Sequence, residues 1–184
     1  MQAGELALIA RPPVATAERM DAVLPDLGLD PGGERWPAGN LHQSFSIGAP
    51  AERESALRRA LARIRAPAFD LLFNRVVLGD RWVLRAHGVP AGFARLLEEV
   101  RAALRAEGID CGHGHTPHVT LCDAPPFVQD GSRWLAAPIA WRIDALELVA
   151  AAHHPEPCRT LARRPLPAPP QCELLGAAGP QQAF

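Results

Sequence analysis

The chain has 184 residues, 48% of them hydrophobic, and carries a formal net charge of −1 with a pI of about 6.6. That length and apolar content suffice for one folded domain, and the near-neutral charge excludes the strong basic field that drives non-specific binding to long nucleic acids. All 19 basic residues are arginine and tyrosine is absent, which excludes chemistry that needs a lysine amine or a phenol.

The first third of the chain predicts a strand, a helix and a second strand. Residues 5–10, ELALIA, form an apolar run that ends at two prolines and predicts a strand. A helix is expected from an N-cap at Thr16 to Gly28, because threonine caps helix starts and glycine ends helices. A loop rich in proline and glycine at 29–39 then leads into a strand at 40–48, NLHQSFSIG.

The middle of the chain predicts two helices around a pair of strands. Residues 51–66 form the first helix, with apolar residues at helical spacing and a solvated face of arginines. Residues 69–88 predict two strands joined by a turn at Gly79 and Asp80. The second helix has its apolar residues on the 3.6-residue period and ends at Gly108. The two apolar stripes are Leu57, Leu61 and Ile64 in the first helix, and Phe93, Leu96, Leu97, Val100 and Leu104 in the second.

The last third predicts strands followed by a tail. HVTLC at 118–122 is a short strand, IAWRIDALELVAA at 139–151 is a single strand, and 158–166 is an edge strand. From residue 167 the chain has little to bury, so 167–184 are expected to form a disordered tail.

The cysteines and the N-terminus indicate where the protein resides. Four cysteines form no CxxC pair, so they predict reduced thiols in the cytoplasm: Cys111, Cys122, Cys158 and Cys172. Residues 1–13 have no basic region, and their apolar run is too short for a signal peptide or a membrane span. We therefore expect a cytoplasmic monomer with no membrane partner.

The order of the elements indicates an approximate duplication within an α+β, mixed α/β fold. In each half, a helix and a loop rich in glycine or proline precede a strand that reads His, any residue, hydroxyl residue, apolar residue. The two histidines, His42 and His118, lie 76 residues apart (118 − 42). A duplication would make the two strands pseudo-symmetric partners.

The two strands carry side chains that suit a phosphodiester. Residues i and i+2 of a strand share one face, so His42 is expected beside Ser44, and His118 beside Thr120. Gln43, Phe45 and Ile47 are expected on the opposite face of the first strand. If the strands lie close together, two hydroxyls can donate to phosphate oxygens while two imidazoles stand on either side of phosphorus. Because the ordinary pKa of histidine is about 6.5, one ring can accept a proton while the other donates one, without a metal.

The segments HQSFSIG and HVTLC resemble the paired signatures of the 2H phosphoesterase superfamily. The branch they resemble most is the RNA 2′,3′-cyclic phosphodiesterase, or 2′-5′ RNA ligase, family, and the likeness covers about residues 5 to 165. It implies that residues 1–166 form a single bilobal domain with pseudo-twofold symmetry, in which two antiparallel sheets line a central cleft and the helices lie outside.

The resemblance also implies the chemistry. His42 and His118 would be catalytic, Ser44 and Thr120 would bind the phosphate, and neither a cofactor nor a metal would be needed. His118 would activate water and His42 would protonate the leaving 3′ oxygen, which leaves a 2′-phosphate on an RNA end or a small cyclic nucleotide. Any RNA joining would be the reverse of transesterification, because the chain has no lysine to adenylate.

The second motif departs from the family where an apolar residue and an arginine commonly follow. Cys122 and Asp123 stand there, so a carboxylate replaces a cation that would help to hold an anion. In the first motif, Ser44 stands where threonine is usual and keeps the hydroxyl. Ser46 and Cys122 are expected to be small fillers of the cleft floor.

Two other functions remain open on the sequence. Four side chains in CGHGHTPH offer nitrogen and sulfur ligands for zinc, which predicts a zinc-dependent hydrolase: Cys111, His113, His115 and His118. The third hypothesis is a catalytically silent module that binds a nucleotide or an RNA end.

Four further residues lie near the motifs. Trp36 and Trp134 are expected in loops, where anchoring the loop to the core is favoured over stacking on a base. For Arg75 and Arg133, neutralising a phosphate and a plain surface role are equal alternatives.

Overall fold

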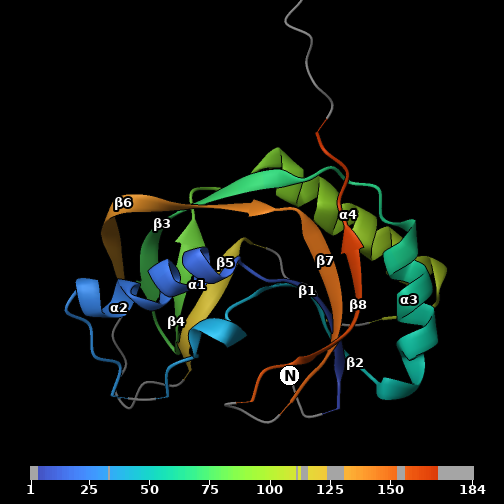
Figure 1. The fold of residues 1–184 in the computed structure, drawn as a ribbon, viewed down its shortest axis with the longest axis horizontal. Helices are drawn as coiled ribbons and strands as arrows, with labels where there is room; N and C mark the ends of the chain where they lie inside the picture. Colours follow the sequence, from blue (N-terminus) through green and yellow to red (C-terminus); the bar gives the residue numbers. More distant parts are fainter. Residues whose placement is uncertain are drawn as a thin grey trace, which may run out of the picture.

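The computed structural model of the chain describes residues 4–32, 34–110, 112, 116–123, 131–152 and 156–169. Within these residues the chain forms two four-stranded antiparallel sheets, with helices packed around them (Figure 1). The predicted α+β class with two antiparallel sheets is therefore confirmed.

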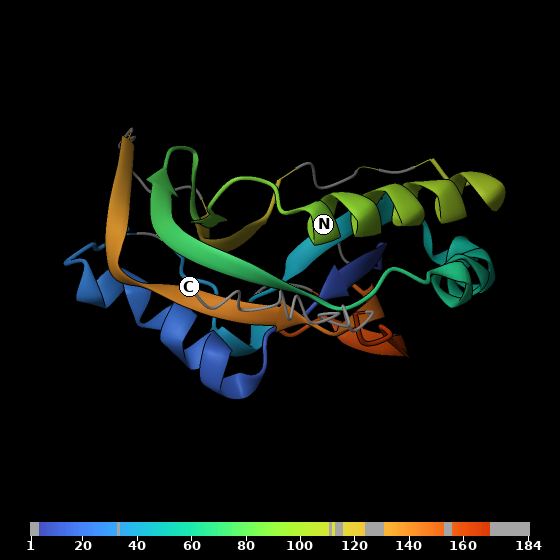
Figure 2. The same ribbon diagram turned by 90° about the horizontal axis from the view of Figure 1, so that it is seen from above.

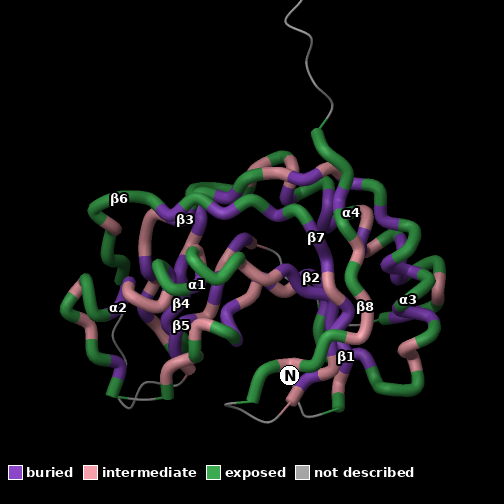
Figure 3. The backbone as a smooth tube through the Cα atoms, in the orientation of Figure 1, coloured by how far each residue is buried: buried purple, intermediate pink, exposed green. Residues whose placement is uncertain are grey.

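The first sheet has its strands in the order β2-β1-β7-β8. Their bounds are Leu6–Ala10 for β1, Gln43–Ala49 for β2, Ala145–Ala150 for β7 and Arg159–Pro165 for β8. All five residues of β1 are buried, as expected for a central strand that is covered on both faces (Figure 3). The predicted strand at 5–10 and the predicted edge strand at 158–166 are both confirmed.

The second sheet has the order β5-β4-β3-β6. Its strands are β3 Phe69–Leu78, β4 Arg81–Ala86, β5 His118–Asp123 and β6 Gly131–Ile143. The hairpin of β3 and β4 turns at Gly79 and Asp80, where the sequence predicted it.

Helices pack against both sheets. Their bounds are α1 Val14–Asp21, α2 Val23–Asp26, α3 Glu54–Arg63 and α4 Ala91–Ala106, with two short 3-10 turns, η1 Ala38–Asn40 and η2 Ala51–Arg53. The predicted apolar stripes of α3 and α4 are buried. Gly108, with a φ of +63°, ends α4 as predicted, and Ile109 N–H donates to Leu104 O in the pattern that closes a helix through a left-handed residue.

The two halves repeat one arrangement. In the first half, α1 and α2 connect β1 to β2. In the second half, α4 connects β4 to β5. Each unit pairs its two strands antiparallel and leaves the second strand at the edge of its sheet. The duplication inferred from the motifs is therefore present in the topology, and both motif-bearing strands are edge strands.

The first helix differs from its prediction at both ends. It begins directly after Pro13, so Thr16 lies in its first turn, where Thr16 N–H donates to Pro13 O, and does not cap it. Proline pre-sets the backbone angle that a helix start needs, and this outweighs the capping preference of threonine. The helix also breaks before Pro25, which has no N–H to donate to Asp21 O, and that carbonyl accepts a hydrogen bond from Arg35 at 2.6 Å instead.

The apolar run at 139–151 is two strands and not one. The chain leaves β6 at Ile143, passes Asp144 and enters β7 in the other sheet (Figure 1). The backbone of Asp144 is engaged outside both strands, since its carbonyl accepts from Leu166 N–H at 2.7 Å. The prediction was wrong because both strands are apolar and a single residue, Asp144, separates them, which is too weak a local signal to mark a change of sheet.

Two arginines of α3, which are exposed as predicted, and Arg53 at the end of η2 also join α3 to α4. Arg59 and Arg63 pair with the buried carboxylate of Glu107 at 2.8 and 2.9 Å. Arg53 donates to the carbonyl oxygens of Glu107 and Gly108, both at 2.8 Å, at the C-terminal end of α4. Cations at this end of a helix are favourable because the last carbonyls carry partial negative charge.

Several predictions fall partly outside the described residues. Pro167 O accepts from Ala68 N–H at 2.8 Å, so the ordered contacts extend past residue 166, and residues 170–184 of the expected tail lie outside the described part. Cys122 and Cys158 are free thiols, whereas Cys111 and Cys172 are not described. Of the helices in the described ranges, none has the length and apolarity needed to cross a membrane.

Candidate active site

The side chain of Gln43 in β2 joins the two motif-bearing edge strands. Its Oε1 accepts a hydrogen bond from the backbone N–H of His118 at 2.6 Å, and its Nε2 donates to Ser44 O at 2.8 Å. A second contact lies further along β2, where Ile47 N–H donates to Gly112 O at 2.9 Å. Gln43 is fully buried, so these bonds satisfy its amide in a place where an unpaired polar group would be costly.

Each histidine ring is held in the same way. His42 Nδ1 lies 2.7 Å from the carbonyl oxygen of Asn40, and His118 Nδ1 lies 2.9 Å from that of Thr116, so both bonds reach the residue two positions earlier. A carbonyl oxygen can only accept, so each neutral ring carries its hydrogen on Nδ1. The lone pair is therefore on Nε2 of both rings, which leaves Nε2 as the atom that can accept a proton.

Both histidines are partly buried, and both titrate below the usual range. Burial is the largest cause that lowers the pKa of His42 and of His118 from the ordinary 6.5, and the carbonyl bond of each ring opposes it. Positive charge lowers both further: Arg11 and His118 act on the pKa of His42, and Arg85 and Arg81 act on the pKa of His118. Both rings are therefore neutral in the free protein at pH 7.

The motifs themselves do not reveal two arginines that lie next to the histidines. Arg85 in β4 is the register partner of His118 in β5. Arg11 directly follows β1, the strand that pairs with β2, and its charge acts on His42. Arg11 is held by Glu147 at 3.5 Å, whereas the described ion pairs do not include Arg85. Sequence spacing could not find these residues, because only strand pairing brings them to the histidines.

The two predicted phosphate-binding hydroxyls are accessible. Ser44 and Thr120 are partly exposed, and within the described chain no hydrogen bond occupies either side-chain oxygen. Ser46, expected to fill the cleft floor, instead accepts a hydrogen bond from Leu8 N–H at 3.1 Å, where the register of β1 and β2 shifts. The shift also turns Ile47 outward, to 39% exposed, so the prediction that it shares a face with the buried Gln43 and Phe45 was wrong.

Asp123, the residue that departs from the family pattern, has two partners. Its Oδ2 accepts a hydrogen bond from Trp36 Nε1 at 2.8 Å, and its Oδ1 forms an ion pair with Arg81 at 2.9 Å. Trp36 packs on the core and meets the ring of His42 edge-on, with 5.8 Å between centroids. Trp36 thus anchors its loop, as predicted, and the carboxylate is neutralised by an arginine. Beside it, Cys122 is fully buried, and burial raises the pKa of its thiol.

Trp134 does not anchor a loop, so that prediction was wrong. It lies in β6, in the half that bends away from the rest of the strand (Figure 2), and it is 63% exposed. The guanidinium carbon of Arg75 lies 5.4 Å from the centre of its ring. Arg133, its neighbour in the chain, is exposed and bonds only the adjacent Ser132 carbonyl among the described contacts.

The alternative zinc site falls largely on undescribed residues. Cys111, His113 and His115 lie outside the described part, and only His118 can be placed. Among the described residues, His, Cys, Asp and Glu side chains do not form a group of three that could hold a metal ion.

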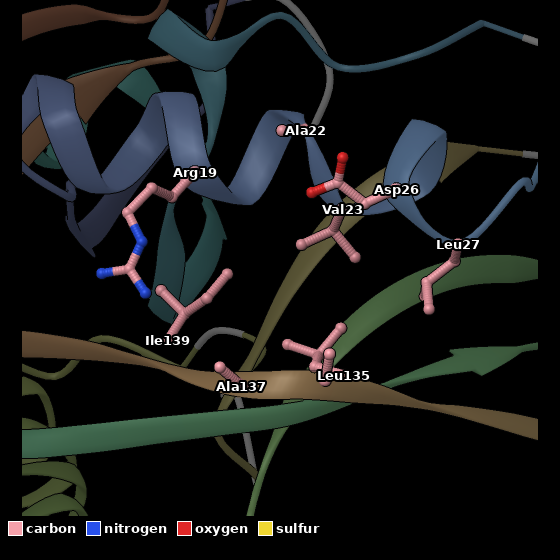
Figure 4. A pocket seen from close by; sticks show the side chains of 9 residues that line it. Arg19, Ala22, Val23, Asp26, Leu27, Leu135, Ala137 and Ile139 are labelled. Carbon is pink, nitrogen blue, oxygen red and sulfur yellow. The ribbon is translucent and has the colours of Figure 1, made fainter.

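A separate pocket of about 330 Å³ lies between the α1–α2 region and β6 (Figure 4). Among its described lining residues, Arg19 and Asp26 are the only charged ones, and aliphatic side chains such as Val23 and Leu135 line most of the rest. It contains neither motif histidine and offers no acid–base pair of imidazoles, so the histidine site remains the candidate active site.

Comparisons with known proteins bear on the fold. No family model matches the sequence, and no curated protein sequence matches it. Among solved structures, E. coli LigT complexed with NADP+ superposes with a TM-score of 0.74 at 21% identity, over 91% of this chain and 99% of LigT. The chain has the LigT fold.

Two further structures share the LigT fold. TT0787 of Thermus thermophilus matches with a TM-score of 0.69 at 17% identity, over 89% of this chain and 98% of its own. The MHV ns2 PDE domain matches with a TM-score of 0.53 at 20% identity, over 81% and 99%. These neighbours share the arrangement of helices and antiparallel sheets in this chain, so the predicted α+β fold with two antiparallel sheets is supported a second time. Other structures of E. coli LigT hold ATP, 3′-AMP and phosphate.

Proposed function

We propose that the protein is a metal-independent cyclic phosphodiesterase that opens 2′,3′-cyclic phosphates on RNA ends or nucleotides to 2′-phosphates. The observation that carries this proposal is the matched pair of histidines, with His42 directly before β2 and His118 at the start of β5, each with Nδ1 bound to a carbonyl and Nε2 left to exchange protons. The LigT fold supports the same reaction class.

In the proposed reaction the two histidines have opposite roles. His118 Nε2 takes a proton from water as the water oxygen attacks phosphorus, and the bond from phosphorus to O3′ breaks. His42 gives its Nε2 proton to O3′, so the products are a 2′-phosphate and a free 3′-hydroxyl. His42 must be protonated when substrate is bound. The anionic phosphate beside it stabilises the protonated ring and so raises the pKa of His42. The topology relates the two histidines by pseudo-symmetry, so the assignment of acid and base follows the family resemblance.

The remaining groups of the site suit the charge of the substrate. Ser44 and Thr120 donate hydrogen bonds to the non-bridging phosphate oxygens, and bonds to an anion are stronger than bonds between neutral groups. Asp123 stands where the family commonly has an arginine, and Arg11 and Arg85 supply the positive charge that this arginine would provide. A 5′-hydroxyl of a second RNA in place of water would attack the same phosphorus, and this joins two RNAs by transesterification without a lysine.

Turnover in the presence of EDTA tests the proposal. The protein is incubated with 2′,3′-cyclic AMP and with an oligoribonucleotide that ends in a 2′,3′-cyclic phosphate, and ³¹P NMR identifies the phosphomonoester that forms. We expect the 2′-phosphate, at the same rate with and without chelator. Activity that EDTA removes and zinc restores would instead support the zinc hydrolase, and binding without any product would support the silent binding module.

Gln43 is expected to position the second motif. Replacing Gln43 with leucine leaves the His118 N–H without its acceptor, so we expect kcat/KM to fall at least about 10-fold and the free energy of unfolding to fall by about 1–3 kcal/mol. Ser46→Ala is the matched control, because it also removes a buried acceptor of a backbone N–H. It should cost similar stability and leave kcat/KM unchanged. Equal loss of activity in both variants would show that Gln43 acts through stability alone.

The dependence of kcat/KM on pH is expected to be bell-shaped, with its maximum below pH 6.5. The reactive free enzyme has one neutral and one protonated histidine, and this form is most abundant between the two pKa values, both of which are lowered from 6.5. Replacing Arg11 with methionine removes a charge that lowers the pKa of His42, so the maximum should move to higher pH. A wild-type maximum above pH 7 would contradict the assignment of both histidines.

A further inference from the structure

A row of four residues crosses the whole second sheet and begins at the candidate catalytic His118. His118 in β5 is the register partner of Arg85 in β4, Arg85 is the partner of Arg75 in β3, and Arg75 is the partner of Trp134 in β6. Directly opposed residues of antiparallel strands point to the same face. Neighbouring strands lie about 4.8 Å apart, so the row extends about 14 Å from the histidine. That span leaves room for a second phosphate and a second base beside the one at His118.

Most N–H donors of the two arginines in the row are not used in the described contacts. The described ion pairs include neither Arg75 nor Arg85. Arg85 donates to Thr116 Oγ1, and Arg75 donates from Nη1 to Asn74 Oδ1 at 3.1 Å and to Ala86 O at 3.5 Å. A guanidinium has five N–H donors, so most of them remain for a ligand. The two guanidiniums are also close to each other. Burial is the largest cause that lowers the pKa of Arg85, and the positive charge of Arg75 lowers it further. Two adjacent cations without a carboxylate favour an anion between or above them.

Trp134 differs from the tryptophans that build the core. Trp82 and Trp141 are 0% and 2% exposed, whereas Trp134 is 63% exposed. Arg75 lies over its ring, and this contact orients the indole without covering it. An exposed, oriented indole next to guanidiniums that pair with no described carboxylate is the combination by which proteins hold single-stranded nucleic acid, with bases on the aromatic ring and phosphates on the cations.

We propose that Arg85, Arg75 and Trp134 bind the nucleotide on the 5′ side of the cyclic phosphate, so that the substrate is the 3′ end of an RNA chain and not a free nucleotide. This inference rests on the proposed function, which sets the cyclic phosphate at His118. The phosphodiester to the preceding nucleotide then lies on the two arginines, and the preceding base stacks on Trp134. The polymer is RNA, because a 2′,3′-cyclic phosphate requires a 2′-hydroxyl.

The test compares two substrates on matched variants. We measure kcat/KM for 2′,3′-cyclic AMP and for a short oligoribonucleotide that ends in a 2′,3′-cyclic phosphate. Trp134→Ala is expected to lower the value for the oligoribonucleotide about 5- to 150-fold, the range of one base–aromatic stack, and to leave that for cyclic AMP within about twofold. Arg75→Ala is expected to act in the same direction. It should also make the slope of log affinity against log salt less steep by about 0.7, the value for one phosphate contact on a single strand.

Arg133→Ala is the control. Arg133 is exposed and adjacent to Trp134 in the strand, so its side chain points to the other face, and its replacement should change neither substrate. Equal losses on both substrates in Trp134→Ala, or no loss on the oligoribonucleotide, would overturn the inference and leave the proposed hydrolysis standing.

Binding separates failure of the inference from failure of the proposed function. Fluorescence anisotropy measures the Kd of a labelled oligoribonucleotide that ends in a 2′-phosphate. In one outcome, wild type hydrolyses neither substrate and still binds this RNA, with Trp134→Ala weakening the binding about 5- to 150-fold. That result would refute the proposed hydrolysis and support RNA binding by Arg85, Arg75 and Trp134. If wild type neither hydrolyses nor binds, or if Trp134→Ala binds as tightly as wild type, the row is not an RNA site.

Discussion

Replacing His42 or His118 with alanine is expected to lower kcat/KM for a 2′,3′-cyclic phosphate about 10²- to 10⁴-fold in each case. Each ring performs one of the two proton transfers, and water must replace it in the variant. The two transfers belong to one step, so the double variant should be little slower than either single variant. Steady-state hydrolysis of the cyclic-phosphate oligoribonucleotide, followed by the release of the 2′-phosphate, measures the effect.

The matched control is His87→Ala. His87 is exposed and approaches only Asn74, at 3.4 Å, among the described contacts, so its loss should leave kcat/KM unchanged. Circular dichroism and thermal unfolding establish that the two active-site variants remain folded. A folded His42→Ala or His118→Ala variant within about threefold of wild type would refute the two-histidine mechanism.

Removing either site hydroxyl is expected to lower kcat/KM about 10- to 100-fold. Ser44→Ala and Thr120→Val each delete one hydrogen bond to an anionic phosphate, and bonds to charged groups contribute about 1.5–3 kcal/mol. The two hydroxyls come from different sheets, and each would hold its own oxygen. The double variant should therefore lose about the product of the single effects.

Ser55→Ala serves as the control for the hydroxyl variants. Ser55 lies in α3 and is exposed, and the described hydrogen bonds do not include its hydroxyl. Its replacement should leave the kinetics unchanged. A loss seen only in KM would mean that the hydroxyls bind substrate and transition state equally, whereas a loss in kcat would mean that they act on the charge that develops during attack. No change in either constant would exclude Ser44 and Thr120 from the phosphate site.

Local patterns in the sequence were enough to predict the elements with a strong period and the residues of the two motifs. The burial of β1, the apolar stripe of α4 and its end at Gly108 follow from neighbouring residues alone, because periodicity and a left-handed glycine are local properties. The duplication of the motifs could also be predicted from the sequence. It indicated that the two motif strands would be in contact, as the bond between Gln43 and His118 shows. Where two local signals competed, as at Pro13 and Thr16, the sequence did not show which one would start the helix.

The set of side chains that meet at the site could not be predicted, because it depends on how the two sheets pack. The bond from Gln43 to His118, the arginine beside each histidine and the partners of Asp123 all join segments far apart in the chain. Strand register sets such contacts, and one bulge, as at Ser46, moves every later side chain to the other face. Register depends on the turns, helices and packing of the whole fold, so no pattern within a single strand contains it.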